Sequence, residues 1–139
     1  MVSLQHRVKK QTTQLFLLFS HRLTEDQRQN AEQVLGITRY ISLPPDLQKR
    51  WSQVPPDETD LTEYAQPIWV WLMQHAKKGD YALVQGETGL VHLSVNFCRL
   101  LNVQPIYATT QRVIEEEPMP DGSVHIKRTF KHTGFRNYE

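Results

Sequence analysis

Three short polar segments contain residue types that could bind a phosphate. Ser20-His21-Arg22 offers a hydroxyl, an imidazole and a guanidinium directly after the apolar run Leu15–Phe19. A guanidinium fork matches phosphate oxygens, and an imidazole transfers protons near neutral pH. The other two segments follow apolar stretches as well. The second consists of Gln85, Gly86, Glu87, Thr88 and Gly89, and the third of Thr109, Thr110, Gln111 and Arg112.

The apolar stretches before these segments predict strands of a parallel sheet. Five unbroken apolar residues, as in Leu15–Phe19, are typical of a strand that is buried on both faces. Ligands of such sheets bind outside the carboxyl ends of the strands. We therefore expect the three polar segments to share one edge. Gly86 and Gly89 would let a phosphate approach the backbone N–H groups at the start of the next helix.

Each of these functional interpretations has an alternative in which the residues have only a structural role. The sequence Gly86–Gly89 matches neither the Walker nor the dinucleotide fingerprint, so a plain capped turn is the alternative there. His21 could instead pack against or cap a helix. The acidic run Glu115–Glu117 favours a solvated face over a cation site. The six histidines lack the spacing of a zinc motif, so no metal is expected.

Strands alternate with helices along the chain, and this order predicts an α/β, Rossmann-like fold. We expect a mostly parallel sheet with helices on both faces and a C-terminal antiparallel hairpin that turns at Pro120-Asp121-Gly122. Besides the strands Leu15–Phe19, Tyr81–Val84 and Pro105–Ala108, the expected elements are a helix at Thr24–Leu35, an edge strand at Ile37–Leu43, a short helix at Asp46–Gln53, a helix at Asp60–Lys78 that kinks or starts at Pro67, a helix from Leu90 to Leu101, and the hairpin stretches Arg112–Glu117 and Ser123–Phe130. Thr24 and Gln27 predict a capping box at the start of the first helix, and Leu47 and Trp51 should share one face of the short helix.

Length and charge restrict the function classes. A chain of 139 residues predicts one domain, at residues 14–139, after a flexible basic extension at residues 1–13. A net charge of +1 excludes general coating of duplex nucleic acid, so any such contact needs a local cluster. The single Cys98 is expected to be a buried structural thiol in a reducing cytoplasm. Neither a membrane span nor a signal peptide is expected.

The order and spacing of several segments resemble a known family. FLLFSHRLTEDQ, LPPDLQKRWSQVPP, KKGDYALVQGETG, PIYATTQR and PDGSVHIKRTFKHTGFRNYE are similar to the small ring nucleases of type III CRISPR systems, which are related to CARF sensor domains. The resemblance runs from about Leu15 to Glu139. It implies a homodimeric CARF-like domain that linearises cyclic oligoadenylate, with cyclic tetra-adenylate as the expected ring. Such an enzyme switches off an antiviral second-messenger signal and uses no cofactor.

The implied reaction is metal-independent attack of a ribose 2′-OH on the adjacent phosphorus. We expect His21 to handle the proton, and Arg22 or Arg112 to stabilise the charge of the phosphorane. The expected ligand-binding residues are Ser20, Gln85, Gly86, Glu87, Thr88, Gly89, Thr109 and Thr110, with Lys131 and Arg136 closing over the ring from the C-terminal segment.

Two alternatives stay open at this point. The same pocket could hold the ring without cleaving it, as a sensor or sponge. An output domain would be expected of a sensor, and none is recognisable in this sequence, which favours the enzyme. The basic, aromatic C-terminal segment could instead bind RNA, although the near-neutral charge weighs against that reading.

Overall fold

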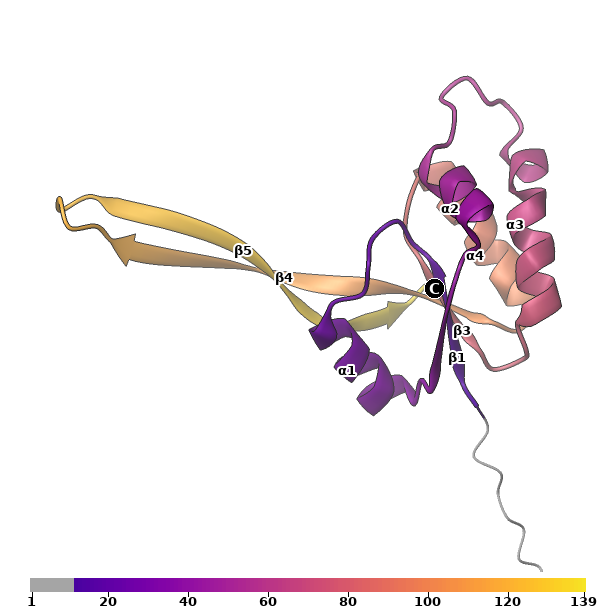
Figure 1. Cartoon of the computed structure of the whole chain (residues 1–139), viewed down its shortest axis with the longest axis horizontal. Coiled ribbons are helices and arrows are strands. Elements are labelled where there is room, and N and C mark those ends of the chain that lie inside the picture. The colour runs from indigo at the N-terminus through magenta and orange to yellow at the C-terminus, as the bar shows by residue number, and fades with distance from the viewer. Residues whose placement is uncertain (1–11) are drawn as a thin grey trace, which may run out of the picture.

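The computed structural model describes residues 12–139, and the predicted extension at residues 1–13 lies almost entirely outside that range. The described chain forms the predicted α/β fold (Figure 1). Its elements are β1 (Gln14–Leu18), α1 (Glu25–Leu35), β2 (Arg39–Ser42), α2 (Pro45–Ser52), α3 (Leu61–His75), β3 (Tyr81–Val84), α4 (Thr88–Leu100), β4 (Gln104–Pro118) and β5 (Val124–Asn137).

The five strands form one sheet in the order β2-β1-β3-β4-β5. The first four run parallel, and β5 returns antiparallel to β4. This confirms the mostly parallel, Rossmann-like sheet, and β2 lies at its edge as predicted. β2 lies on one side of β1, whereas β3, β4 and β5 lie on the other side. The direction in which strands are added therefore reverses between β1 and β3.

Both faces of the sheet are covered by helices, as predicted. Helix α1 lies on one face, and α2, α3 and α4 lie on the other (Figure 1). Successive β1 residues alternate between the two cores: Leu15 and Leu17 pack toward α1, whereas Phe16 and Leu18 pack toward α3 and α4. This burial on both faces explains the unbroken apolar run, because neither side of β1 meets water.

Local sequence signals set most helix ends. At the start of α1, the Thr24 side chain accepts from the Gln27 N–H, and the Gln27 side chain accepts from the Thr24 N–H, which confirms the predicted capping box. Gly36 ends that helix in the left-handed conformation, with φ of 68°. Helix α3 starts at Leu61 and passes through Pro67.

The predicted end of α3 at Lys78 is wrong, because the helix stops at His75. The buried Asp80 carboxylate accepts from the Lys77 N–H at 2.8 Å, and its other oxygen accepts from the Gln14 N–H at 3.1 Å. The Asp80 carboxylate therefore binds the backbone just after the helix end and links it to the start of β1.

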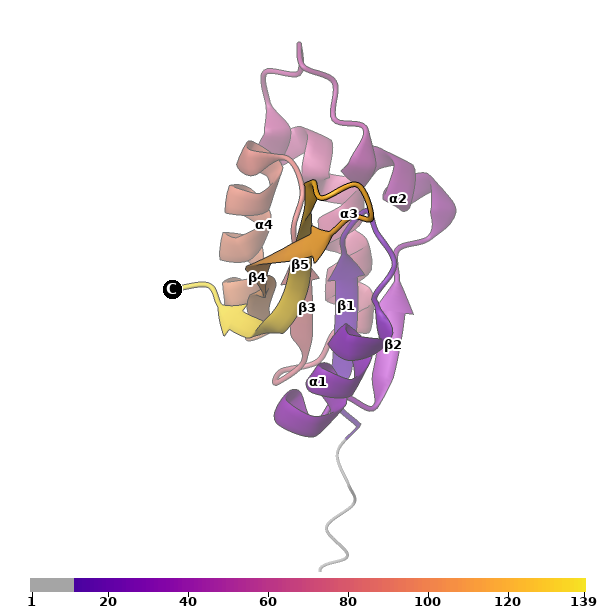
Figure 2. The same cartoon turned by 90° about the vertical axis from the view of Figure 1, so that its left-hand side faces the viewer.

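The predicted C-terminal antiparallel hairpin is confirmed, but both of its strands are longer than predicted. Strand β4 was expected to end at Ala108, but it continues to Pro118 and pairs with β5 throughout. The outer part of the pair leaves the body and projects as a two-stranded ribbon (Figure 1). We call residues 110–132 the arm. Figure 2, turned by 90°, shows that α1 lies beside the base of the arm.

Two further expectations concern burial. Cys98 is fully buried, and this burial raises the pKa of its thiol to about 12, as expected of a structural cysteine. Within residues 12–139, none of the helices has the length and apolar character needed to cross a membrane.

Candidate functional site

The predicted polar segments meet at the carboxyl edge of the sheet. The Gln85 N–H donates to the carbonyl of Leu18 at 3.0 Å, which joins the end of β3 to the end of β1. The Gln85 Oε1 atom accepts from the Ala108 N–H at 2.8 Å, which joins β3 to β4. The backbone N–H and the side chain of Gln85 together therefore link three neighbouring strands at this edge.

Helix α2 covers the end of β1. Gln48 Nε2 donates to the carbonyl of Phe19 at 3.0 Å and also contacts Ser52 Oγ at 3.0 Å. Ser52 Oγ lies 3.0 Å from Ser20 Oγ. The predicted Ser20 hydroxyl is thus exposed but already hydrogen-bonded, and it marks the border between α2 and the edge.

The glycine at position 86 is needed for close packing. The indole Nε1 of Trp51 donates to the carbonyl of Gln85 at 3.0 Å. A Cβ atom on Gly86 would lie only 2.9 Å from the same Nε1 atom. The turn after β3 therefore accepts the indole ring because residue 86 has no side chain.

The start of α4 is capped by its own sequence. The Glu87 carboxylate accepts from the N–H of Gly89 at 3.0 Å and from the N–H of Leu90 at 2.8 Å. A phosphate at a helix start would bind the same kind of N–H groups, which here donate to the carboxylate of the chain itself. A Cβ on Gly89 would lie 2.8 Å from Leu61 Cδ1, so this glycine also permits packing of α3 on α4.

One hollow lies on the α4 side of the edge, and we call it the tyrosine hollow. It has a volume of about 370 Å³ and is lined by Gln85, Gly86, Thr88, Val91, Tyr107 and Tyr138. The rings of Tyr107 and Tyr138 lie 4.8 Å apart between centroids, tilted by 54°. The structure thus combines three predicted residues with two aromatic rings in one concave site.

Hydrogen bonds fix both tyrosines. The Tyr138 hydroxyl donates to the carbonyl of Val84 at 2.6 Å, and burial raises the pKa of this tyrosine, so it stays protonated at neutral pH. Arg136 Nη1 donates to the Tyr107 hydroxyl at 3.2 Å. Arg136, which was predicted to bind the ligand, therefore lies beside the tyrosine hollow and contacts Tyr107, one of the residues that line it.

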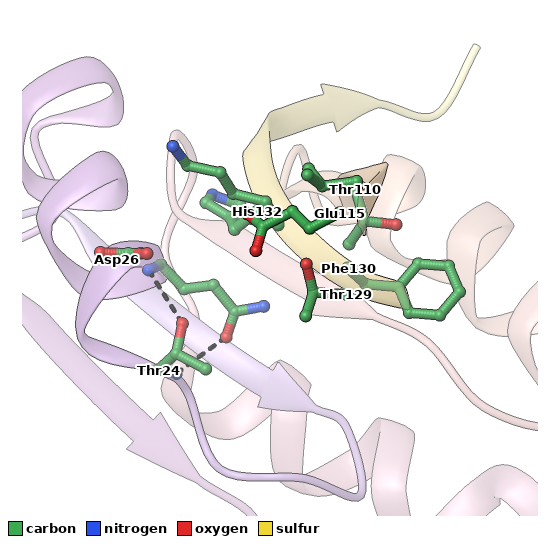
Figure 3. Close-up of a pocket in the computed structure, with 10 residues that line it drawn as sticks. Thr24, Asp26, Thr110, Glu115, Thr129, Phe130 and His132 are labelled. Atoms are coloured by element: carbon green, nitrogen blue, oxygen red, sulfur yellow. Dashed lines mark hydrogen bonds between the residues drawn. The ribbon is translucent and has the colours of Figure 1, made fainter. Parts of the chain in front are cut away.

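A larger groove lies on the α1 side, and we call it the α1 groove (Figure 3). Its volume is about 610 Å³, and it separates the first turn of α1 from the base of the arm. Of the predicted residues it contains Thr110 and Lys131. Its complete lining is Thr24, Asp26, Gln27, Thr110, Val113, Glu115, Thr129, Phe130, Lys131 and His132.

His132 joins the arm to α1 in this groove. Its Nε2 atom lies 3.1 Å from Asn30 Oδ1, whereas its Nδ1 atom is buried and has no hydrogen-bond partner among residues 12–139. Because the Asn30 oxygen can only accept, Nε2 carries the proton and Nδ1 is unprotonated. Burial lowers the pKa of His132, against a smaller opposing effect of Asp26.

Eight of the predicted site residues line neither hollow. Ser20, Glu87, Gly89 and Arg136 are placed above, and the other four are His21, Arg22, Thr109 and Arg112. His21 and Arg22 are exposed in the loop between β1 and α1, where the His21 ring meets the Phe19 ring edge-on at 5.4 Å. Thr109 contacts the Thr133 hydroxyl and the Gly134 carbonyl at a β-bulge. Arg112 is exposed on the arm, beyond the edge.

Several residues of the edge were not predicted from the sequence. Tyr107 and Tyr138 are separated by 31 positions, and only the register of the β4–β5 pair brings their rings together. Trp51 was expected to be a helix-face residue, which does not reveal that its Nε1 atom reaches the β3 turn. The sequence signal for Tyr107 and Tyr138 was the presence of one tyrosine in PIYA, at residues 105–108, and one in RNYE, at residues 136–139.

A third hollow, of about 400 Å³, lies at the opposite, amino edge of the sheet. It contains Arg39, His75 and Lys77, so it is a second place where an anion could bind. Among the described residues, no group of three or more histidine, cysteine, aspartate or glutamate side chains is arranged to hold a metal ion.

Comparison with known proteins places the chain in a family. The model of the "Uncharacterized protein MJ1673 family" matches residues 13–136. The chain belongs to the MJ1673 family. A relative in Methanocaldococcus jannaschii, "Uncharacterized protein MJ1673", is 45% identical over 124 residues, which cover 89% of this chain and 95% of the relative. No solved structure matches the chain.

The part of the chain that matches the MJ1673 family includes the whole arm and most of the lining of both hollows. The tyrosine hollow offers aromatic faces, an amide and a guanidinium within one neighbourhood. The α1 groove offers hydroxyls and the ammonium of Lys131. In this member of the MJ1673 family, the carboxyl edge thus has groups for stacking a base and groups for binding a phosphate.

Proposed function

We propose that this chain binds cyclic oligoadenylate, with cyclic tetra-adenylate as the expected ring, at the carboxyl edge of its sheet and linearises it. In this proposal the protein is a cytoplasmic, homodimeric, CARF-like ring nuclease that ends type III CRISPR signalling. The observation that carries the proposal is the tyrosine hollow, because it joins the polar turn after β3 to two tyrosine rings.

The chemistry of the ligand fits this arrangement. An adenine has a π-face that stacks on aromatic side chains, and such stacking contributes roughly 1–3 kcal/mol per base. Tyr107 and Tyr138 offer that surface, and Gln85 offers an amide for a base edge or a ribose. Arg136 and Lys131 lie on opposite sides of the base of the arm, so phosphates on both sides of it would meet a cation.

Cleavage needs in-line geometry more than a cofactor. The ribose 2′-OH attacks the neighbouring phosphorus, the 5′-oxygen leaves, and a 2′,3′-cyclic phosphate forms. Orientation supplies a large part of the rate enhancement in such a reaction. We assign the proton to His21 and the negative charge of the phosphorane to Arg22 or Arg112. All three side chains are exposed in one chain, so they would act on a ligand held between two chains.

The test is incubation with labelled cyclic tri-, tetra- and hexa-adenylate in EDTA, followed by separation of the products. The proposal predicts linear products from the tetra-adenylate ring and a large loss of single-turnover rate in His21→Ala. Full cleavage by His21→Ala would remove the proton-transfer role. Failure of all three rings to bind would refute the proposal as a whole.

One observation favours a second function, which is binding without cleavage. The Glu87 carboxylate occupies the N–H groups of Gly89 and Leu90, so this helix start does not offer them freely to a developing phosphorane. A sensor or sponge needs only the stacking surface and the cations. Intact ring that comigrates with the protein in the same assay would identify that function.

A further inference from the structure

The arm presents one face with an apolar stripe. Directly opposed residues of an antiparallel pair point to the same side of the ribbon. The register therefore assigns one set of four pairs to a single side, which we call the open face. These pairs are Arg112 with Phe130, Ile114 with Arg128, Glu116 with Ile126, and Pro118 with Val124.

The apolar side chains of the open face are uncovered in the single chain. Phe130 is 72% exposed, Ile114 59%, Val124 57% and Ile126 52%. On the other face, Val113 and Thr129 are half-buried beside the α1 groove, and Glu115 lies opposite Lys127. Phe130 borders the same groove at the base of the open face but remains largely exposed. A ribbon of only two strands is marginally stable in water, so the stripe needs a cover.

The charges on the open face indicate which partner could pack against it. Along β4, this face presents Arg112, Ile114 and Glu116, which is a basic, apolar, acidic order at alternate positions. When a second copy of this strand runs in the opposite direction, its acidic residue faces the basic residue of the first copy, and its basic residue faces the acidic one. A second copy that runs antiparallel, with Ile114 opposite Ile114, would bring Arg112 next to Glu116 of the partner subunit.

The apolar residues of β5 fit the same arrangement. Phe130 and Ile126 lie equally far from the level of Ile114, one toward the base of the arm and one toward its tip. In the antiparallel pair, Phe130 would therefore pack on Ile126 of the partner subunit. The long side chain of Arg128 lies near the axis on the β5 side, from where it extends to solvent.

We propose that two copies of this chain associate through their arms, open face on open face, antiparallel and with the two-fold axis at Ile114. The interface is isologous, so it closes at two chains. This inference deepens the homodimer of the proposed function but needs no ligand. In the paired arms Arg112 contacts Glu116 of the partner subunit, so the phosphorane charge falls to Arg22. Each arm leaves its body at the carboxyl edge, so the edges of both chains face each other across the paired arms.

Charge reversal with rescue tests this register. Sedimentation velocity without any nucleotide should show twice the mass of one chain. Arg112→Glu and Glu116→Arg should each raise the dissociation constant by about tenfold or more, because each one brings like charges together. The double variant should return it to within about threefold of the wild-type value, because the order of charges is only inverted.

The other face supplies the matched control. The double exchange of Glu115→Lys with Lys127→Glu alters as many charges on the same ribbon but should leave the dimer unchanged. Ile114→Glu should give a monomer with an unchanged circular dichroism spectrum. A wild-type protein that stays monomeric, a dimer that withstands the single reversals, or a double variant without rescue would each overturn the proposal. A dimer with this behaviour that ignores every ring would refute only the proposed function.

Discussion

Single atoms decide the shape of the carboxyl edge. A Cβ on Gly86 would meet the indole of Trp51, and the Gln85 carbonyl needs the same indole as its donor. The Tyr138 ring lines the tyrosine hollow, and its hydroxyl donates to the carbonyl of Val84. At this scale the site is an arrangement of backbone carbonyls and the aromatic side chains that reach them.

Substitution of Gly86 tests how tightly the edge is packed. Gly86→Ala should lower the free energy of unfolding by about 1–3 kcal/mol, because the new methyl group would lie 2.9 Å from Trp51 Nε1. Urea denaturation measures this change. Gly134→Ala is the control, since its nearest atom would be at 3.8 Å, and it should change stability by about 0.5 kcal/mol or less. Equal effects of the two substitutions would contradict the packing described for Trp51.

The state of His132 predicts a dependence on pH. Burial lowers the pKa of this histidine below its ordinary value of 6.5, so its contribution to stability is present above that value and is lost as the pH falls through the lower, folded value. We expect the wild type to lose more stability between pH 7.5 and pH 5 than His132→Gln, as measured by urea denaturation. Parallel losses in the two proteins would show that the histidine has no such role.

At the scale of elements, buried apolar runs and helix caps made most of the fold predictable. The run Leu15–Phe19 predicted β1, and Thr24 with Gln27 predicted the start of α1. The Pro120-Asp121-Gly122 turn predicted the hairpin, but not that its first strand is continuous with Pro105–Ala108. Among residues 110–118 only Val113 is partly buried, so no apolar alternation marks the continuation of the strand.

The edge itself was predictable only in part. The rule that polar segments after parallel strands share one edge placed Gln85, Gly86 and Thr88 correctly beside β4. The rule does not show what covers that edge. The hydrogen bonds of α2 to the end of β1, and the return of Tyr138 beside Tyr107, depend on contacts between segments far apart in the chain.

The cap of α4 allows a test at this scale. Glu87→Ala should reduce the free energy of unfolding by about 1 kcal/mol, because the N–H groups of Gly89 and Leu90 lose their acceptor. Glu87→Gln keeps one acceptor oxygen and should lose less. Thermal unfolding of the three proteins measures both effects. An alanine variant as stable as the wild type would show that the carboxylate is dispensable as a cap.

At the scale of the molecule, the two hollows lie on either side of the base of the arm, and both open at the carboxyl edge. The paired-arm dimer would bring two such edges together, which suits a ligand with internal two-fold symmetry. The amino edge, with Arg39, His75 and Lys77, is the competing place for a phosphate-rich ligand. The proposed function requires that the ligand contact the carboxyl edge.

Titration of the isotope-labelled protein with cyclic tetra-adenylate, followed by amide NMR shifts, tests this most directly. Binding at the carboxyl edge predicts that the largest shifts fall on the amides of Gln85, Gly86, Thr88, Tyr107 and Tyr138. The amides of Arg39 and Lys77 should stay in place and serve as the internal control. Shifts centred on Arg39 and Lys77, or no shifts at a several-fold excess of the ring, would contradict it.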